Sequence, residues 1–312
     1  MLTENKVLIA LVVIFAAISA VTAQIKPKKL LVVTTTAGFR HDVDMVEKEL
    51  MSIARESGLF TLDFLRQPPG RPTPPKAVPP LKAGATAEEK QAFDDAGWEF
   101  KIADSVYQAN AAMWYAVDLK KALEPLAPRS LAKYDGVIFA STTGELPMPD
   151  RPGFLDWIRS GKAFIGIHAA TDTLYGWPEY HEMIGGTFIR HGAQVGVDVI
   201  NADPQHPANR KLPPVWKIDL EEIYQFKNYD PSRVHELLVL DKHPNDKAAG
   251  HYPLAWCRDY GNGRVFYTAL GHRADLWKTD PTLKDRKNPP ETARAYREHL
   301  LGGILWALRV AK

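Results

Sequence analysis

The 312-residue sequence contains a single cysteine, Cys257. A chain with one thiol forms no internal disulfide, so core packing must hold its folded state. One cysteine also excludes the zinc sites that are built from paired cysteines. Cys257 ends the apolar run at residues 253–257, away from any glycine-flanked turn. This position favours a buried, inert thiol over a nucleophile.

The sequence has no excess of charge of either sign. It contains 39 Lys and Arg residues against 37 Asp and Glu residues, which gives a formal net charge of +2. Proteins that bind nucleic acid or anionic lipid through charge need a strongly basic surface. We therefore expect no nucleic-acid partner.

Long apolar runs are also absent, except at the N-terminus. Residues 7–21 form an apolar run that follows Lys6 and ends at Val21-Thr22-Ala23. A positive residue, an apolar stretch and small residues in this order are typical of a signal peptide, here residues 1–23 with cleavage before Gln24. An uncleaved anchor is the alternative, but the run is short for a membrane span. We expect a secreted or periplasmic protein without stable membrane insertion.

Short apolar runs alternate with amphipathic stretches over most of the remaining chain. Runs rich in β-branched residues predict strands that are buried on both faces, and alternation with helices predicts an α/β fold with a parallel sheet. Residues 24–312 suit one large domain with an insertion. The predicted strands are residues 30–35, 60–65, 135–140, 163–167, 194–200, 236–240, 254–258 and 264–268, and the predicted helices are residues 42–57, 152–159 and 292–308.

The predicted insertion covers residues 67–113. Prolines crowd residues 67–81, which favours an exposed and mobile loop. In residues 87–113, alanines and aromatic residues recur every three or four positions, which predicts an amphipathic helix. We expect this helix to fold back onto the body beside the strand ends, where it could act as a lid.

Polar residues, including three histidines, follow several of the predicted strands. His41 comes after the first strand, His168 directly after the strand at 163–167, and His272 after the strand at 264–268. Ligands of open parallel sheets bind beyond the carboxyl ends of the strands, so we expect one cleft there. A histidine in such a place can act as a general base, bind a metal, or only hold a turn. His41 has a further alternative as the polar start of a helix whose N-cap is Asp42.

Glu222 is the carboxylate that we expect beside these histidines. It follows Glu221, and neighbouring residues of an extended chain point to opposite sides, so we expect Glu221 to be solvated. The structural alternative for Glu222 is an ion pair with Arg190 or Arg273. A divalent metal is possible, because ligands from separate strand ends leave no spacing signature in the sequence.

Several motifs in one order resemble the ThuA-like family. The motifs are Gly166-Ile167-His168-Ala169-Ala170, Trp177-Pro178-Glu179-Tyr180, Gly185-Gly186-Thr187-Phe188 with His191, Glu222-Ile223-Tyr224, Pro253-Leu254-Ala255-Trp256, Tyr260-Gly261-Asn262-Gly263-Arg264-Val265-Phe266-Tyr267 and Leu270-Gly271-His272. The resemblance implies a flavodoxin-like fold of the class I glutamine amidotransferase type, and a link to the use of trehalose or related sugars. True amidotransferases form a thioester on a cysteine at the turn where this chain has His168. Glutamine hydrolysis through a thioester is therefore excluded.

Together these features predict an exported carbohydrate-active enzyme, a hydrolase, lyase or isomerase on a glycoside or oxidised sugar. His168 and Glu222 would transfer protons, and His41 and His272 would complete the pocket. The substrate would be a small carbohydrate, with Trp177, Asp172, Tyr224 and Arg273 as binding residues and Asn228 as a further hydroxyl partner. Core packing is the alternative for any single aromatic residue. A non-catalytic sugar-binding protein is the alternative for the whole chain.

Overall fold

The computed structural model describes residues 26–311, so the predicted signal peptide at residues 1–23 lies outside the described residues. A nine-stranded sheet runs through the protein. Its strands, in spatial order, are β2 (Phe60–Leu65), β1 (Lys28–Val33), β3 (Gly136–Ala140), β4 (Ala163–Ile167), β11 (Gly263–Thr268), β10 (Ala249–Tyr260), β9 (His235–Lys242), β6 (Val195–Asn201) and β7 (Val215–Glu221). A separate antiparallel pair consists of β5 (Thr187–His191) and β8 (Tyr224–Lys227).

The sheet is parallel from β2 to β11 and antiparallel from β11 to β7. The predicted α/β fold is therefore confirmed, and β2 and β4 have the predicted bounds. The strands β5, β7 and β8 were not among the predicted strands, and they are short or half-exposed. The parallel strands β1, β3, β4 and β11 direct their carboxyl ends to one edge of the sheet.

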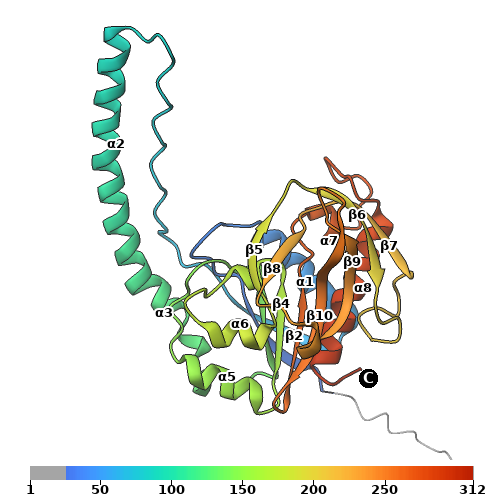
Figure 1. Cartoon of the computed structure of the whole chain (residues 1–312). Coiled ribbons are helices and arrows are strands. Elements are labelled where there is room, and N and C mark those ends of the chain that lie inside the picture. The colour runs from blue at the N-terminus through green and yellow to red at the C-terminus, as the bar shows by residue number, and fades with distance from the viewer. Residues whose placement is uncertain (1–25, 312) are drawn as a thin grey trace, which may run out of the picture.

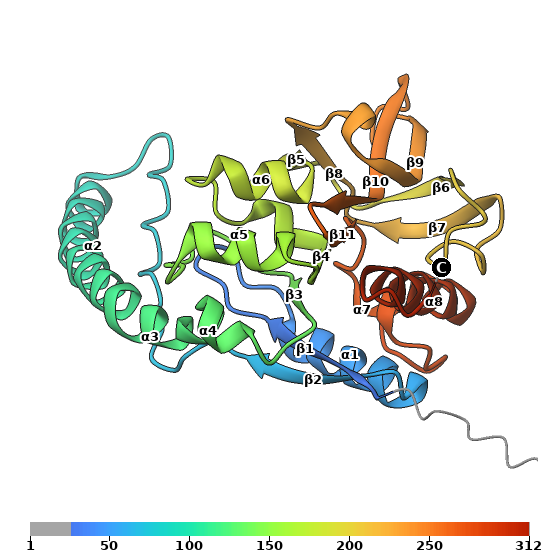
Figure 2. The same cartoon turned by 90° about the horizontal axis from the view of Figure 1, so that it is seen from below.

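Helices cover both faces of the sheet (Figure 2). On one side lie α1 (Val43–Ser57), α7 (Ala274–Trp277) and α8 (Pro290–Ala307), and on the other lie α4 (Pro128–Leu131), α5 (Arg151–Arg159) and α6 (Pro178–Ile184). The shorter pieces are α3 (Lys120–Ala122), a π-helical turn at Tyr115–Leu119, and 3-10 turns at Glu124–Leu126, His168–Asp172 and Pro231–Arg233. No helix between residues 26 and 311 has the length and apolar character that a membrane span requires.

Each buried strand supplies side chains to two separate cores. In β3, Ile138 packs in the core beneath α1 and α8, whereas Val137 and Phe139 pack in the core beneath α5 and α6. This division follows from the two-residue period of a strand. Strand β4 is likewise buried along its whole length. Central strands covered on both faces give a rigid base for the loops that follow them.

A long helix, α2 (Ala87–Trp114), stands away from the body as an arm (Figure 1). Thr86 and Glu89 form a capping box at its start, which fixes the first turn. Only Trp114, its last residue, is buried, and Trp98 is 66% exposed. The prediction of a helix is thus right, but the prediction that it folds back onto the body is wrong. Apart from Trp114, the residues of this helix are exposed or half-buried, so the body does not cover its apolar side chains.

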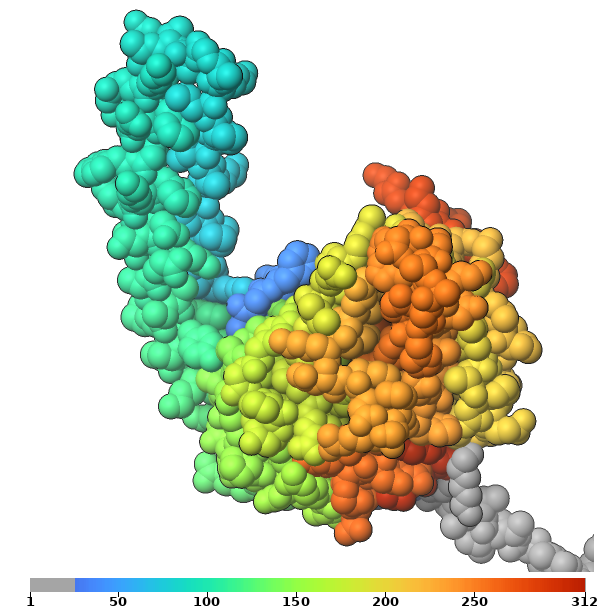
Figure 3. Space-filling model, viewed as in Figure 1, coloured from blue at the N-terminus to red at the C-terminus, as the bar shows by residue number. Residues whose placement is uncertain are grey.

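The base of the arm is tied to the loop that follows β1. The guanidinium of Arg71 donates to the backbone carbonyls of Thr36, Ala37 and Gly38, at 3.3, 3.2 and 2.6 Å. The indole Nε1 of Trp114 donates to the Pro69 carbonyl at 3.0 Å. Figure 3 shows an open gap between arm and body, with the blue segment between β1 and α1 at its floor.

Trypsin should first cut the extended segment that leads into the arm. Lys76 and Lys82 are exposed and lie in backbone without helix or strand, where a protease can bind the chain. The expected products end at these two lysines and can be identified by mass spectrometry. A Lys76→Gln, Lys82→Gln variant should resist this first cleavage. First cuts inside the sheet would contradict the prediction.

The protein should lose stability in mild acid through His299 of α8. This side chain is fully buried, and its Nδ1 donates to the Ala208 carbonyl at 3.2 Å. Burial lowers the pKa of His299 from 6.5 to about 3, although the bond to Ala208 opposes the shift. Below pH 6.5 the unfolded chain therefore binds a proton that the native state does not bind. The unfolding free energy should fall by up to about 1.4 kcal/mol per pH unit for this group.

Urea unfolding between pH 7 and pH 4.5 measures this slope. His299→Gln does not titrate and keeps a donor for Ala208, so it should show a flatter dependence. The exposed His235, whose side chain is 56% accessible, provides the control: His235→Gln should leave most of the slope in place. An unchanged slope in His299→Gln would show that other groups cause the acid sensitivity.

Candidate functional site

Four side chains meet at the carboxyl edge of the parallel strands. His41 lies between β1 and α1, His168 directly follows β4, Glu222 lies between β7 and β8, and His272 lies between β11 and α7. One potential ligand atom from each side chain lies within 4.8 Å of all the others. We call these four residues the His–Glu centre. The structure thus brings together all four residues that the sequence analysis proposed as catalytic.

His168 occupies a sharp turn that orients its ring. Its φ angle is +52°, in the left-handed region that non-glycine residues rarely adopt, and the side chain has no exposed surface. Nδ1 donates to the Ala269 carbonyl at 2.8 Å. A neutral ring with its proton on Nδ1 has its lone pair on Nε2, which faces the Tyr224 hydroxyl at 3.1 Å and the other members of the centre. The backbone therefore engages only Nδ1 of His168, and Nε2 contacts side chains.

The two carboxylate oxygens of Glu222 face different partners. Oε1 lies 3.7 Å from His168 Nε2 and 3.5 Å from His272 Nδ1. Oε2 lies 3.3 Å from Nδ1 of His191, at the end of β5. The close partners of Glu222 are histidines. The alternative of an ion pair with Arg190 or Arg273 is therefore wrong. His191 stood in one of the family-like motifs, but no other feature of the sequence singled it out.

Glu221 is not solvated, so that expectation is wrong. It has no exposed surface, and its carboxylate accepts from the backbone N–H groups of Gly271, His272 and Arg273 at 3.1, 2.7 and 3.3 Å. The strand β7 ends at Glu221, so alternation between the two glutamates does not continue to Glu222. Burial raises the pKa of Glu221 to about 8, although the three backbone donors oppose the shift. Glu221 therefore fixes the turn that carries His272.

Burial keeps the imidazoles of the centre neutral near pH 7. It lowers the pKa of His41 to about 4, with a further contribution from His272. Burial, followed by repulsion from neighbouring histidines, also lowers the pKa values of His168 and His272. His41 Nδ1 is buried and has no hydrogen-bond partner. The pKa of Glu222 is raised by burial, and the nearby His191 opposes that shift.

Two of the predicted substrate-binding residues are unsuited to that role. Trp177 is only 4% exposed, so the core covers the ring that a sugar would need to stack on. Arg273 directs its guanidinium to both oxygens of Asp275, at 3.0 and 2.9 Å, and to Gln194. The buried Asp275 needs this cation, since an unpaired buried charge is costly.

Of the other predicted binding residues, Tyr224 and Asp172 lie near the centre, and Asn228 does not. Tyr224 is buried, and its hydroxyl contacts His168. Asp172 is half-buried and accepts from the Tyr175 hydroxyl at 2.6 Å, whereas Asn228 lies on a separate surface pocket. Two aromatic rings beside these residues are exposed. Tyr175, next to Asp172, is 43% exposed, and Phe39, next to His41, is 66% exposed. The Phe39 ring lies 4.9 Å from the His41 ring, and sequence position alone did not distinguish it from other loop aromatics.

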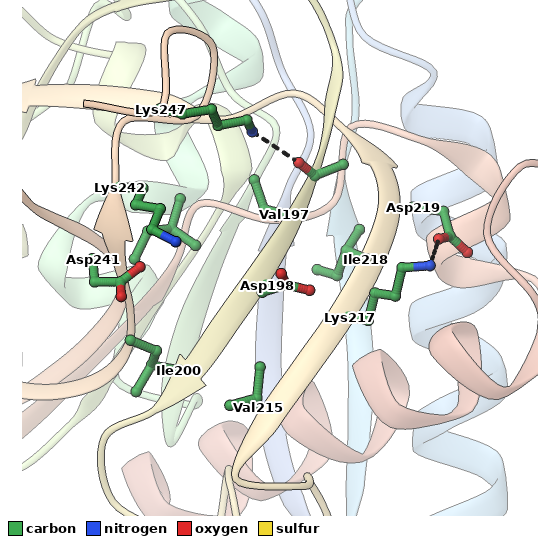
Figure 4. A pocket seen from close by; sticks show the side chains of 12 residues that line it. Val197, Asp198, Ile200, Val215, Lys217, Ile218, Asp219, Asp241, Lys242 and Lys247 are labelled. Atoms are coloured by element: carbon green, nitrogen blue, oxygen red, sulfur yellow. Dashed lines mark hydrogen bonds and ion pairs between the residues drawn. The ribbon is translucent and has the colours of Figure 1, made fainter. Parts of the chain in front are cut away.

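A large groove lies elsewhere, on the antiparallel half of the sheet (Figure 4). It has a volume of about 700 Å³ and is lined by β6, β7 and β9. Two of its three lysines have partners: Lys217 pairs with Asp219 at 2.8 Å, and Lys247 donates to the Gly196 carbonyl at 3.2 Å. Alternating charges of both signs are typical of a solvated strand face. The chemistry therefore points to the His–Glu centre and not to this groove.

Comparison with known proteins gives one family and a set of similar folds. Residues 87–307 match the model of the ThuA family, described as trehalose utilisation. A crystal structure of a ThuA-like protein from Parabacteroides merdae is 18% identical with a TM-score of 0.58, covering 91% of this chain and 90% of that one. One from Bacteroides uniformis is also 18% identical, with a TM-score of 0.56 and coverages of 93% and 94%. No curated protein matches the sequence.

Proposed function

The chain belongs to the ThuA family, and we propose that it is a carbohydrate-active enzyme whose reaction takes place at the His–Glu centre. The substrate is a glycoside or an oxidised sugar, and the reaction is a hydrolysis, an elimination or an isomerisation. These reactions share one requirement, which is a base that removes a proton from a sugar carbon, a hydroxyl group or water. The family description, which refers to trehalose, supports the choice of carbohydrate as substrate class.

The arrangement of His168 carries the proposal. The Ala269 carbonyl fixes its tautomer, and the free Nε2 lies 3.7 Å from the Glu222 carboxylate. A neutral imidazole beside a carboxylate can accept a proton and be stabilised once it is charged. A left-handed backbone at a buried polar residue is a strained arrangement of the kind that collects at reaction sites. These observations support His168 and Glu222 as the pair that transfers protons.

A non-catalytic sugar-binding protein is the alternative, and the composition of the centre disfavours it. A binding protein needs hydroxyl-pairing groups and an aromatic platform. It does not need three neutral imidazoles gathered with a buried carboxylate, because desolvating such groups costs free energy. The exposed rings of Phe39 and Tyr175 would supply the platform in either case.

Cys257 supports the separation from amidotransferases. It is 1% exposed, and burial raises the pKa of its thiol to about 12. Its sulfur lies 3.6 Å from His206 Nε2, and neither residue belongs to the His–Glu centre. Thiolates, not thiols, act as nucleophiles. Cys257 therefore has no role in the proposed reaction.

The experiment is an activity assay on a panel of disaccharides and their keto derivatives, followed by chromatography and mass spectrometry. At least one member should be consumed, with a product that identifies the bond acted on. A His235→Gln protein, altered at an exposed histidine outside the centre, serves as the control and should keep full activity. Binding of a sugar without turnover on any panel member would favour the non-catalytic alternative.

We also propose that the protein is exported, and the mature chain should begin near Gln24. The apolar run at residues 7–21 and the small residues at 21–23 support this proposal. Intact mass measurement of the secreted or periplasmic protein should show the loss of residues 1–23. Recovery of chains that retain Met1 in the membrane fraction would overturn it.

A further inference from the structure

Three of the four ligand atoms of the His–Glu centre stand at separations close to those of a coordination sphere. His168 Nε2 and His272 Nδ1 are 3.3 Å apart, and Glu222 Oε1 lies 3.5 Å from His272 Nδ1 and 3.7 Å from His168 Nε2. A tetrahedral ion with bonds of about 2.0–2.1 Å holds neighbouring ligand atoms about 3.3–3.4 Å apart. With the fourth ligand atom, from His41, the whole set stays within 4.8 Å.

The partners of these side chains orient them as ligands. The Ala269 carbonyl takes the Nδ1 proton of His168, which directs the Nε2 lone pair into the centre. The second oxygen of Glu222 faces His191, so Oε1 is left for the centre. Outer partners of this kind fix the tautomer and orientation of ligands at metal sites. The buried, unpartnered Nδ1 of His41 is a further free nitrogen.

The charge of the centre is also suited to a cation. Among the described residues, no lysine or arginine forms an ion pair with Glu222, whose partners are His168, His191 and His272. Its neighbours in the centre are neutral imidazoles, the form in which histidine binds metals. A buried carboxylate without a permanent cation is costly, and a divalent ion would remove that cost.

We propose that the His–Glu centre binds one divalent transition-metal ion through His41, His168, His272 and Oε1 of Glu222. Imidazole-rich sites suit zinc, iron, nickel and copper more than magnesium or calcium. Binding of the ion through Nε2 would make His168 a ligand in the metal-bound protein, in place of its proposed role as base, and Oε2 of Glu222 would remain to accept a proton. Loss of His168 would lower activity in either role. The ion would polarise a sugar oxygen or activate water. This catalytic use rests on the proposed function, whereas binding of the ion does not.

The test uses the full protein without a polyhistidine tag, stripped of metal by a chelator and titrated with Co²⁺. Visible d–d absorption should saturate at one ion per chain, and Zn²⁺ should displace the signal. His41→Gln and His272→Gln, whose rings are partly exposed, should weaken Co²⁺ binding by more than the roughly 10–100-fold that loss of an outer partner causes. His251→Gln, at an exposed histidine paired with Glu236, should bind as the parent does.

Circular dichroism of the metal-free variants confirms that they fold. The proposal is overturned if the parent takes up no stoichiometric ion, or if both centre variants bind Co²⁺ as the parent does. One bound ion without turnover of any sugar would leave the metal site in place and contradict the proposed function. Turnover by a protein that binds no ion would contradict the metal site and leave the proposed function in place.

Discussion

Replacing His168 with asparagine should reduce kcat/KM for the processed sugar by about 10²–10⁴, the range that loss of a general acid or base produces. Asparagine tolerates the left-handed backbone of this position. It can also donate to the Ala269 carbonyl as the histidine does. The variant should therefore fold while it lacks the Nε2 lone pair. Steady-state kinetics and a thermal unfolding curve measure the two effects separately.

Two results would separate a reacting group from a merely structural one. If His168 acts at the reacting atoms, the loss should lie mainly in kcat, and the folded fraction should stay near that of the parent. If it only holds the turn, the unfolding temperature should fall and the remaining folded protein should keep its kcat. Full activity in His168→Asn would end the proposed mechanism, although the fold assignment would stand.

Replacing Glu221 with alanine should destabilise the protein by on the order of 3 kcal/mol or more. The change leaves the N–H groups of Gly271, His272 and Arg273 without their acceptor in a buried turn, and each such loss costs about 1–3 kcal/mol. Because this turn carries His272, activity and metal affinity should fall with stability. Urea unfolding gives the free-energy difference.

The control lies two positions earlier on the same strand. Asp219 is exposed and pairs with Lys217, so Asp219→Ala should change the unfolding free energy by less than about 1 kcal/mol. Glu221→Gln keeps one acceptor oxygen and should fall between the two. A Glu221→Ala protein as stable as Asp219→Ala would show that the turn at residues 271–273 holds itself without the carboxylate.

The sequence was most informative where the structure is regular and buried. Strands such as β4 are apolar throughout because helices cover both faces, and that pattern predicts a parallel sheet without further knowledge. The strand ends then gave the positions of His168 and His272. In contrast, β5 and β8 are short, and their partly exposed residues show no continuous apolar run. Their pairing depends on the tertiary structure.

The wrong predictions share one physical cause. A local sequence pattern does not show which distant residues a side chain contacts in the folded protein. Trp177 lies in a polar loop, yet Phe154 and Tyr180 pack against its ring. Glu221 was assigned to solvent by alternation along a strand that ends at that residue. Helix α2 carries apolar residues at helical spacing, but only Trp114 at its end is buried. Each outcome depends on distant parts of the chain.

The position of β11 in the sheet means that β4 must wait for one of its partners during synthesis of the chain. This strand pairs with β4 on one side and β10 on the other, yet it is synthesised roughly a hundred residues after β4. At about 5–20 residues per second, β4 stays an unpaired, apolar edge for about 5–20 s on the ribosome. Such edges can pair with other chains. The nascent protein is therefore exposed to misassembly in this interval, and chaperones should bind it while β4 awaits β11.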